Sequence, residues 1–193
     1  MNAVRELIWT GSYGSTTIDQ ICEKAGVKKG SFYYFFDSKA TLAEAALEAE
    51  WERKRVALDQ IFSPTVAPME RIHRFYEYMY NQQVELRSKC GCVLGCPLFT
   101  LGSEVCTQEQ RLLAKVQELL GHWRRYLESA IRDAHAAGLI DAPDAEAKAR
   151  MLFAYQEGML TQARIQNDLG VLREMERGTF AMLGVAEHKH AAA

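Results

Sequence analysis

Apolar residues recur with the period of an α-helix along almost the whole chain. The pattern is clearest over residues 108–136, where a helical stripe carries Leu112, Val116, Leu119, Leu120, Trp123, Leu127, Ala130, Ile131 and Ala134. Gly138 follows as a helix stop. Similar patterns predict long helices over 144–166 and 39–61, with a turn-rich break at 63–68. We find no convincing alternating pattern of a β-strand, so the sequence predicts an all-α fold.

Two short helices are predicted near the N-terminus, within GSTTIDQICEKAGVKKGSFYYFF. Ser15, Thr16 or Thr17 can cap the first helix, and Gly26 ends it. The second helix is expected to begin near Lys28 and to last about two turns. This spacing is typical of a helix-turn-helix, in which the second helix enters the major groove of DNA.

The second short helix combines lysines with a run of aromatic residues, which neither a buried core nor a solvated face explains. Phe32 and Phe36, four residues apart, are expected to face inward. The positions expected to face DNA are Lys28, Lys29, Gly30, Ser31, Tyr33 and Tyr34. Lys39, at the start of the next helix, is expected to contact a phosphate. The alternative is an aromatic mini-core beside solvated lysines.

The stretch TTIDQICEKAGVKKGSFYYFFDSKATLAEAAL resembles the DNA-binding domain of TetR/AcrR-type repressors, over residues 3–47. The resemblance implies a homodimer with a three-helix head at 1–45 and an effector-binding and dimerisation domain at 46–193. The implied partners are a palindromic double-stranded DNA operator and a small-molecule effector. By position, the resemblance assigns phosphate contacts to Thr17, Tyr33 and Lys39, and groove contacts to Lys28, Lys29, Ser31 and Tyr34.

Composition and charge indicate which partners and which cellular compartment to expect. A net charge of −2 excludes a generally basic nucleic-acid binder, but a local basic patch remains possible. No apolar run approaches the ~18 residues of a membrane span, and the N-terminus lacks the order of a signal peptide. Five cysteines, an odd number, argue against a disulfide framework. The sequence therefore predicts a cytoplasmic protein.

A cysteine-rich segment, KCGCVLGCPLFTLGSEVC, leaves three interpretations open. Cys96 and Cys106 can be packed as small apolar residues. Cys96 can instead be a reactive thiol at a helix N-terminus set by Pro97, and Cys90 a second one beside basic residues. Finally, Cys90, Cys92 and Cys96 can bind a thiophilic metal ion, although the paired C-x-x-C spacing of zinc sites is missing.

The part GCPLFTLGSEVC is also similar to the family members that sense electrophiles and hypochlorite, with both cysteines in place, so the resemblance makes Cys96 and Cys106 possible thiol sensors. That resemblance implies a cationic side chain near the sensor thiol, supplied here by Arg164. An arginine keeps the positive charge but not the neutral amine chemistry of a lysine.

Aromatic and methionine residues are frequent in the C-terminal part, and most are expected to be core. The residues expected to line an effector pocket are Phe75, Met79, Phe99, Trp123, Tyr126 and Tyr155. The long helices at 108–136 and 144–166 are expected to pair across a two-fold axis.

Other function classes find little support in the sequence. No Cys-His-Asp pattern, glycine-rich phosphate loop or pair of carboxylates stands out, so neither an enzyme nor a cofactor is predicted. A protein-interaction module built on the same fold remains the alternative to a DNA-binding regulator.

Overall fold

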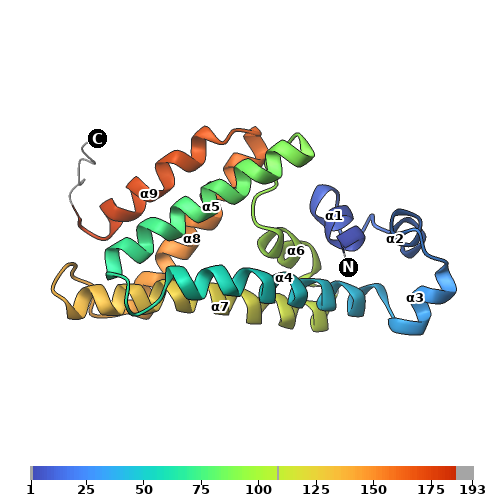
Figure 1. Ribbon diagram of the computed structural model, residues 1–193, viewed down its shortest axis with the longest axis horizontal. Helices are drawn as coiled ribbons and strands as arrows, with labels where there is room; N and C mark the ends of the chain where they lie inside the picture. The colour runs from blue at the N-terminus through green and yellow to red at the C-terminus, as the bar shows by residue number, and fades with distance from the viewer. Residues whose placement is uncertain (1, 108, 186–193) are drawn as a thin grey trace. The chain divides into compact units, whose positions relative to one another are not determined.

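The computed structural model describes residues 2–107 and 109–185. Within these residues the chain is all-α, as predicted, and no strand occurs (Figure 1). The helices are α1 (Asn2–Thr10), α2 (Ile18–Ala25), α3 (Lys29–Phe35), α4 (Lys39–Ile61), α5 (Pro68–Cys90), α6 (Pro97–Val105), α7 (Gln110–Ala136), α8 (Ala145–Gln166) and α9 (Gly170–Met182).

The three long helices predicted from periodicity correspond to α4, α7 and α8, with boundaries that agree within two residues. Gly138 has a φ of 70°, a left-handed conformation that suits glycine and ends α7 as expected. Helix α9 was not singled out by its sequence. The residue before it, Leu169, makes no side-chain capping hydrogen bond, so the usual start signal is missing.

The helices form two compact units. Unit 1 comprises the chain up to Ala57 together with Cys96–Gly121, and unit 2 comprises Leu58–Gly95 and the chain from His122 onward. The division therefore falls within α4 and within α7. Unit 1 is larger than the head expected at 1–45, because α6 and the first part of α7 pack with it.

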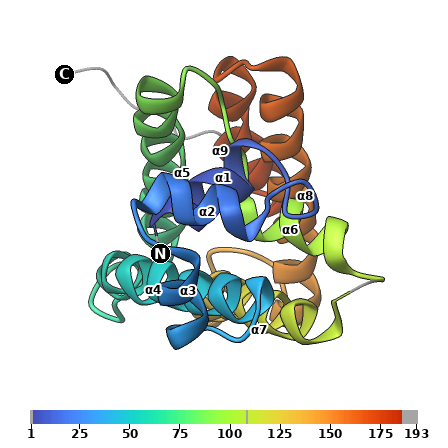
Figure 2. The same cartoon turned by 90° about the vertical axis from the view of Figure 1, so that its right-hand side faces the viewer.

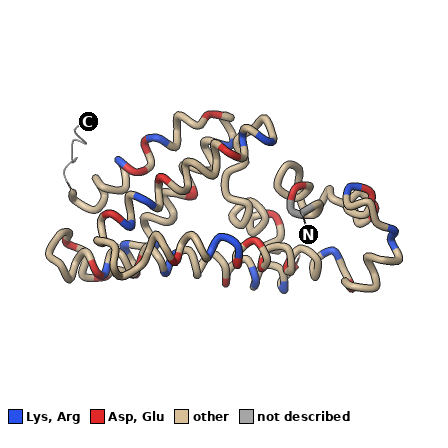
Figure 3. The backbone as a smooth tube through the Cα atoms, in the orientation of Figure 1, with Lys and Arg blue, Asp and Glu red and all other residues tan. Residues whose placement is uncertain are grey.

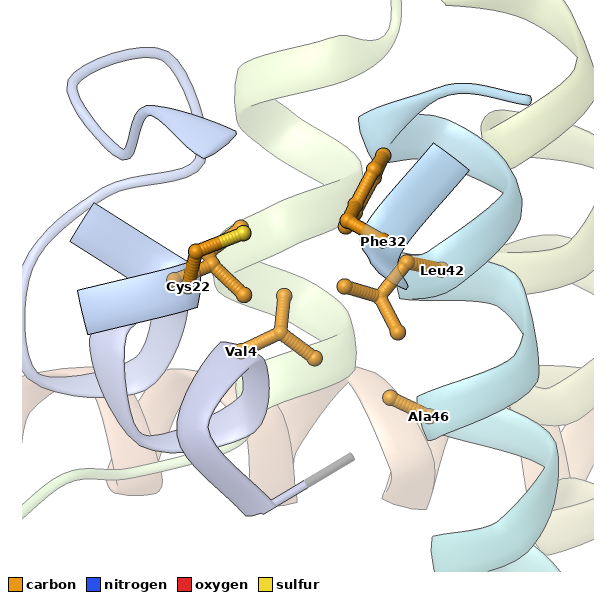
Figure 4. Close-up of a cluster of buried hydrophobic side chains, with 6 residues drawn as sticks. Val4, Cys22, Phe32, Leu42 and Ala46 are labelled. Atoms are coloured by element: carbon orange, nitrogen blue, oxygen red, sulfur yellow. The ribbon is translucent and has the colours of Figure 1, made fainter. Parts of the chain in front are cut away.

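The core of unit 1 consists of two apolar clusters. The first joins α1, α2, α3 and α4 and is drawn in Figure 4; its buried residues are Val4, Ile21, Cys22, Phe32, Leu42 and Ala46. The second joins the α1–α2 connection to α4, α6 and α7 through Tyr13, Ala43, Leu101, Val105, Leu112 and Val116. The helix-turn-helix, α2 and α3, thus packs on α1 and α4, and α4 in turn packs on α6 and α7. These contacts fix its position within the unit.

Unit 2 is organised around α5, α8 and α9, and Figures 1 and 2 show α9 alongside both other helices. One buried cation belongs to this unit. The guanidinium of Arg71 in α5 donates to Asp133 in α7 at 2.5 Å and to the carbonyl oxygens of Pro64 and Val66. Those bonds compensate the burial of its charge and hold the α4–α5 connection.

None of the described helices combines the length and the hydropathy that crossing a bilayer requires.

Candidate functional site

The first helix of the helix-turn-helix is capped at both ends by the residue types that the sequence offers. Of the three candidate caps, Thr17 is the N-cap: its hydroxyl accepts from the amide of Gln20 at 3.2 Å, and the Gln20 side chain accepts from the Thr17 amide at 2.8 Å. This is a complete capping box. At the other end Gly26 has φ 66° and ψ 30°, the left-handed conformation that lets the chain turn into α3.

The aromatic residues of α3 divide between the core and solvent. Phe32 is 5% exposed and packs against Phe36, with ring centroids 6.0 Å apart, as predicted. Tyr33 and Tyr34 are 51% and 82% exposed, so their phenols are available to a partner. Phe35 is exposed as well and makes an edge-on contact with Tyr34. Sequence reasoning gave Phe35 no role, although it belongs to the same aromatic run.

The other candidate DNA contacts lie on the same exposed part of α3. Lys28 is its N-cap residue, and Gly30 and Ser31 are exposed in its first turn. A Cβ at Gly30 would meet nothing of this chain within 4 Å, so the space beside it is open to a partner.

Two lysines in this part of the chain are paired locally, and Figure 3 shows both signs interspersed along the N-terminal helices. The ammonium of Lys29 lies 2.8 Å from a carboxylate oxygen of Asp19, and that of Lys24 lies 2.7 Å from Glu6. The hydrogen bond to Asp19 raises the pKa of Lys29. Both pairs are solvent-exposed and weak, so a phosphate can compete for either lysine.

The side chain of Lys39 binds groups of this chain, although the sequence predicted that it contacts a phosphate. Its Nζ donates to the carbonyl oxygens of Tyr13 and Thr16, at 2.7 and 2.8 Å. It also lies 4.2 Å from the centre of the Tyr13 ring. Burial lowers the pKa of this lysine. In this structure Lys39 therefore fastens the α1–α2 connection, a role that its position in the sequence does not suggest.

Cys96 lies at the N-terminus of α6, as the sequence predicts. It is the N-cap residue, Pro97 is the first residue of the helix, and the Cys96 Sγ accepts a hydrogen bond from the Phe99 amide at 3.4 Å. Amide donors at this position favour a thiolate. Beside Pro97, an apolar hollow of about 30 Å³ is lined by Ile8, Trp9, Ala43, Ala46, Leu47, Glu50, Pro97 and Leu101.

A lysine that sequence reasoning missed lies near this thiol. Lys54 in α4 is close enough to Cys96 for the two groups to interact electrostatically. Its side chain is only 14% exposed, lies 3.5 Å from Glu50 and stands over the Trp9 ring. Burial lowers the pKa of Lys54, and electrostatic attraction to Glu50 and to Cys96 opposes that shift. No sequence signal connects Lys54 with Cys96, because they are brought together only by packing of α4 with α6.

The extended segment before Cys96 is held by three side chains of unit 2. Buried Gln83 donates to the carbonyl oxygen of Gly95 at 3.1 Å and accepts from its amide at 3.0 Å. The amide of Val93 donates to Asn167, and Arg164 donates to the carbonyl oxygen of Leu94. The guanidinium of Arg164, which the sequence resemblance assigned to the thiol, thus has a backbone partner in this segment.

The remaining cysteines differ in exposure and position. Cys90 ends α5 and is exposed, Cys92 is half-buried, and Cys106 is the exposed C-cap residue of α6. Within the described part of the chain, no three His, Cys, Asp or Glu residues come together as a metal site. Among the residues that the structure describes, Cys90, Cys92 and Cys96 thus form no such group, and metal sensing by them stays a hypothesis.

Several of the predicted pocket residues form an aromatic group in unit 2. Phe75 contacts Trp123, with centroids 6.1 Å apart, and Phe62 contacts both Phe75 and Tyr126. Tyr126 donates a short hydrogen bond to Asp59. Phe62 is the member that the sequence did not suggest, since it follows the last turn of α4.

The other pocket candidates lie elsewhere. Tyr155, in α8, donates to the carbonyl oxygen of Glu174 in α9 at 3.4 Å and is close to Tyr76. Met79 is half-buried in α5, whereas Phe99 is an exposed residue of α6 in unit 1.

Comparison with known proteins agrees with this architecture. Residues 1–46 match the model of bacterial regulatory proteins, tetR family, and residues 68–179 match the tetracyclin repressor-like C-terminal domain. The chain belongs to the TetR family. It is a transcriptional regulator of that family with a helix-turn-helix DNA-binding domain.

Individual TetR-family proteins are similar over most of the chain. The transcriptional regulator AcuR of Cereibacter sphaeroides is 30% identical over 156 residues, which are 80% of this chain and 69% of AcuR. The crystal structure of regulatory protein TetR from Rhodobacter sphaeroides is 28% identical, with a TM-score of 0.82 over 94% of this chain and 95% of that one. Reduced NemR from E. coli, 21% identical, shares the fold with a TM-score of 0.80 over 92% and 91% of the two chains.

Proposed function

We propose that this TetR-family protein is a repressor that binds a palindromic operator as a homodimer and is released by a small effector or by modification of Cys96. The observation that carries the DNA-binding part is the outward face of α3. Tyr33 and Tyr34 are exposed there although Phe32 of the same helix is buried. Aromatic side chains left in solvent beside Lys28 fit a phosphate-lined groove better than they fit water.

The surface of α8 supports the dimer. Its exposed side carries Ala147, Met151, Ala154, Gly158 and Ile165, and Ile165 is 77% exposed. These uncharged residues recur along the helix beside the exposed ion pair of Glu146 and Arg150, and a second copy of the chain can cover them. Two linked heads then read two half-sites about one DNA turn apart.

The proposed DNA-binding role is tested with Lys28→Ala and Tyr33→Ala. The probe is a duplex that the unaltered protein selects from a randomised pool. A repressor of the proposed kind loses affinity in both variants, and its salt dependence becomes shallower for Lys28→Ala. An interaction module would select no duplex, or would bind DNA equally well after both substitutions.

The proposal allows two ways in which an effector acts, here called the covalent and the non-covalent branch. In the covalent branch the Cys96 sulfur adds to an electron-poor alkene, a new S–C bond forms, and the neighbouring carbon takes a proton from water, so nothing leaves. The N-cap amide and the nearby Lys54 support a reactive thiolate at Cys96. In the other branch a ligand binds the aromatic group of unit 2 without a covalent bond. In both branches the effector must favour the released state, because equal binding to both states shifts nothing.

N-ethylmaleimide separates the two branches. Intact mass and affinity for the selected duplex are measured before and after treatment, for the unaltered protein and for Cys96→Ser. DNA release that follows the mass increase in the unaltered protein, and is lost in Cys96→Ser, supports the covalent branch. DNA that stays bound while Cys96 carries the label rejects it and leaves the non-covalent ligand.

A further inference from the structure

The connection between α1 and α2 is held by a residue ninety positions further along the chain. Both carboxylate oxygens of Glu104, in the last turn of α6, accept hydrogen bonds from it. Oε2 accepts from the amide of Tyr13 at 2.9 Å, and Oε1 accepts from the amide of Gly14 at 2.6 Å. All these residues belong to unit 1. Because the donors are main-chain amides, Glu104 fixes the path of the backbone through residues 13–16, here called the 13–16 turn.

The approach of this carboxylate leaves little room for a side chain at position 14. A Cβ built on Gly14 would lie 3.0 Å from Oε1 of Glu104, closer than side-chain atoms normally come. The φ of Gly14 is not in the left-handed region, so backbone conformation does not demand glycine here. The tight contact comes instead from the carboxylate, which would have to move by a few tenths of an ångström to admit a Cβ.

The 13–16 turn is also held by Lys39. Its ammonium binds the carbonyl oxygens of Tyr13 and Thr16, so the amides of the turn go to an anion and the carbonyls to a cation. Glu104 and Lys39 are also near enough to attract each other. The Tyr13 ring completes the arrangement by packing with Leu101 and Val105 of α6. The hydrogen bonds of Glu104 and Lys39 to the turn, together with the packed Tyr13 ring, are here called the clamp.

The residue that follows the turn is Thr17, which caps α2 and is a candidate phosphate contact. We propose that Glu104 is a positioning residue for operator binding. It sets the place of Thr17 and of the start of α2 by holding the two backbone amides just before them. This inference rests on the proposed DNA-binding function, since its effect is read as affinity for DNA.

Two variants break the clamp in independent ways. Glu104→Gln keeps the size of the side chain but leaves one amide facing an NH2 group, and Gly14→Ala pushes the carboxylate away. The matched control is Glu109→Gln, which removes a nearby negative charge that makes no hydrogen bond to Tyr13 or Gly14 among the contacts described above. We expect Glu104→Gln and Gly14→Ala to bind the selected duplex about tenfold more weakly, and Glu109→Gln to bind it like the unaltered protein.

Amide hydrogen exchange shows whether the change is local. Exchange at Tyr13 and Gly14 is expected to be slow in the unaltered protein and in Glu109→Gln, and faster in both clamp variants. Exchange in α2 and α3 is expected to stay the same, which a general loss of stability would not allow.

Three results would overturn the inference. Unchanged exchange at Tyr13 and Gly14 in Glu104→Gln would mean that the carboxylate does not hold the turn. Faster exchange with unchanged DNA affinity would mean that the turn does not position the head. Faster exchange throughout unit 1 would mean a structural role alone. If the unaltered protein selects no duplex at all, the proposed function itself fails, and that result is seen before any variant is made.

Discussion

The ammonium of Lys39 lies 2.7 Å from the carbonyl oxygen of Tyr13 and 4.2 Å from the centre of the ring of the same residue. One side chain thus binds both the backbone and the π-face of its partner. Burial raises the pKa of Tyr13 to about 12, with nearby carboxylates adding to the shift. The phenol is therefore neutral under ordinary conditions, and the lysine is bound without a compensating phenolate.

Lys39→Ala should lower stability as well as DNA affinity. Its loss leaves the carbonyl oxygens of Tyr13 and Thr16 without their charged donor, at a cost of about 1–2 kcal/mol in the free energy of unfolding. Lys28→Ala, which alters an exposed residue, should change that free energy by less than about 0.5 kcal/mol. Urea denaturation of both variants measures the difference. Equal stabilities would show that Lys39 serves phosphate binding alone.

Phe32→Ala should lower stability, whereas Tyr34→Ala should lower DNA affinity, although the two residues are only two positions apart. Phe32 is a buried member of the first core cluster, and its truncation should cost about 3–5 kcal/mol of stability. Tyr34 is 82% exposed, so its truncation should leave the melting temperature unchanged and weaken binding to the selected duplex. Calorimetry and a DNA titration check the pair. A large stability loss in Tyr34→Ala would contradict the orientation of α3.

The contact of His73 in α5 with Glu176 in α9 should make stability depend on pH. The two groups are 2.5 Å apart, and the hydrogen bond to Glu176 raises the pKa of His73 above its usual 6.5, while burial opposes the shift and Glu70 and Glu77 add to it. A raised pKa in the folded state means that the stabilisation is fully present below pH 6.5. It is then lost as the pH rises through the raised value.

Glu176→Gln should remove this dependence. The difference in unfolding free energy between the unaltered protein and the variant should be largest near pH 5.5–6 and should shrink toward pH 8–9, as measured by urea denaturation across that range. Glu174→Gln, on the same helix and paired with Arg177, is the control. A difference that does not change with pH would exclude the contact as the cause.

Lys54→Met should slow alkylation of Cys96 at neutral pH. The ammonium of Lys54 attracts negative charge at Cys96, and the thiolate is the form that reacts. Arg53→Met is the matched control, because Arg53 binds the same Glu50 from a largely exposed position. The rate of mass increase with N-ethylmaleimide, in proteins whose Cys90, Cys92 and Cys106 are replaced by serine and whose buried Cys22 is kept, is the measurement. Equal rates in both variants would leave the reactivity of Cys96 to the N-cap amide alone.

What the sequence predicted well was local. A cap within 15–17, the helix end at Gly26 and the inward Phe32 each depend on neighbours within a few residues. The structure agrees with all three and selects Thr17 as the cap. The N-cap position of Cys96 before Pro97 is of the same kind.

What the sequence could not predict depends on residues far apart in the chain. The pairing of Glu104 with Gly14 spans 90 residues, and the proximity of Lys54 to Cys96 arises from helix packing. Periodicity gives the buried face of a helix but not which polar side chain reaches which backbone group. For the same reason Lys39 was expected at a phosphate, and its bonds to Tyr13 and Thr16 were not foreseen.

The make-up of unit 1 bears on how freely such heads can be exchanged between regulators. Residues 1–46 look like a detachable module, yet Tyr13 and Ala43 are buried by Leu101, Val105, Leu112 and Val116 from α6 and α7. A chimera that transplants 1–46 alone would expose that apolar surface and discard Glu104. The portable piece consists of two separate stretches of sequence, the chain up to Ala57 and Cys96–Gly121, so a successful domain swap needs two junctions more than the linear map suggests.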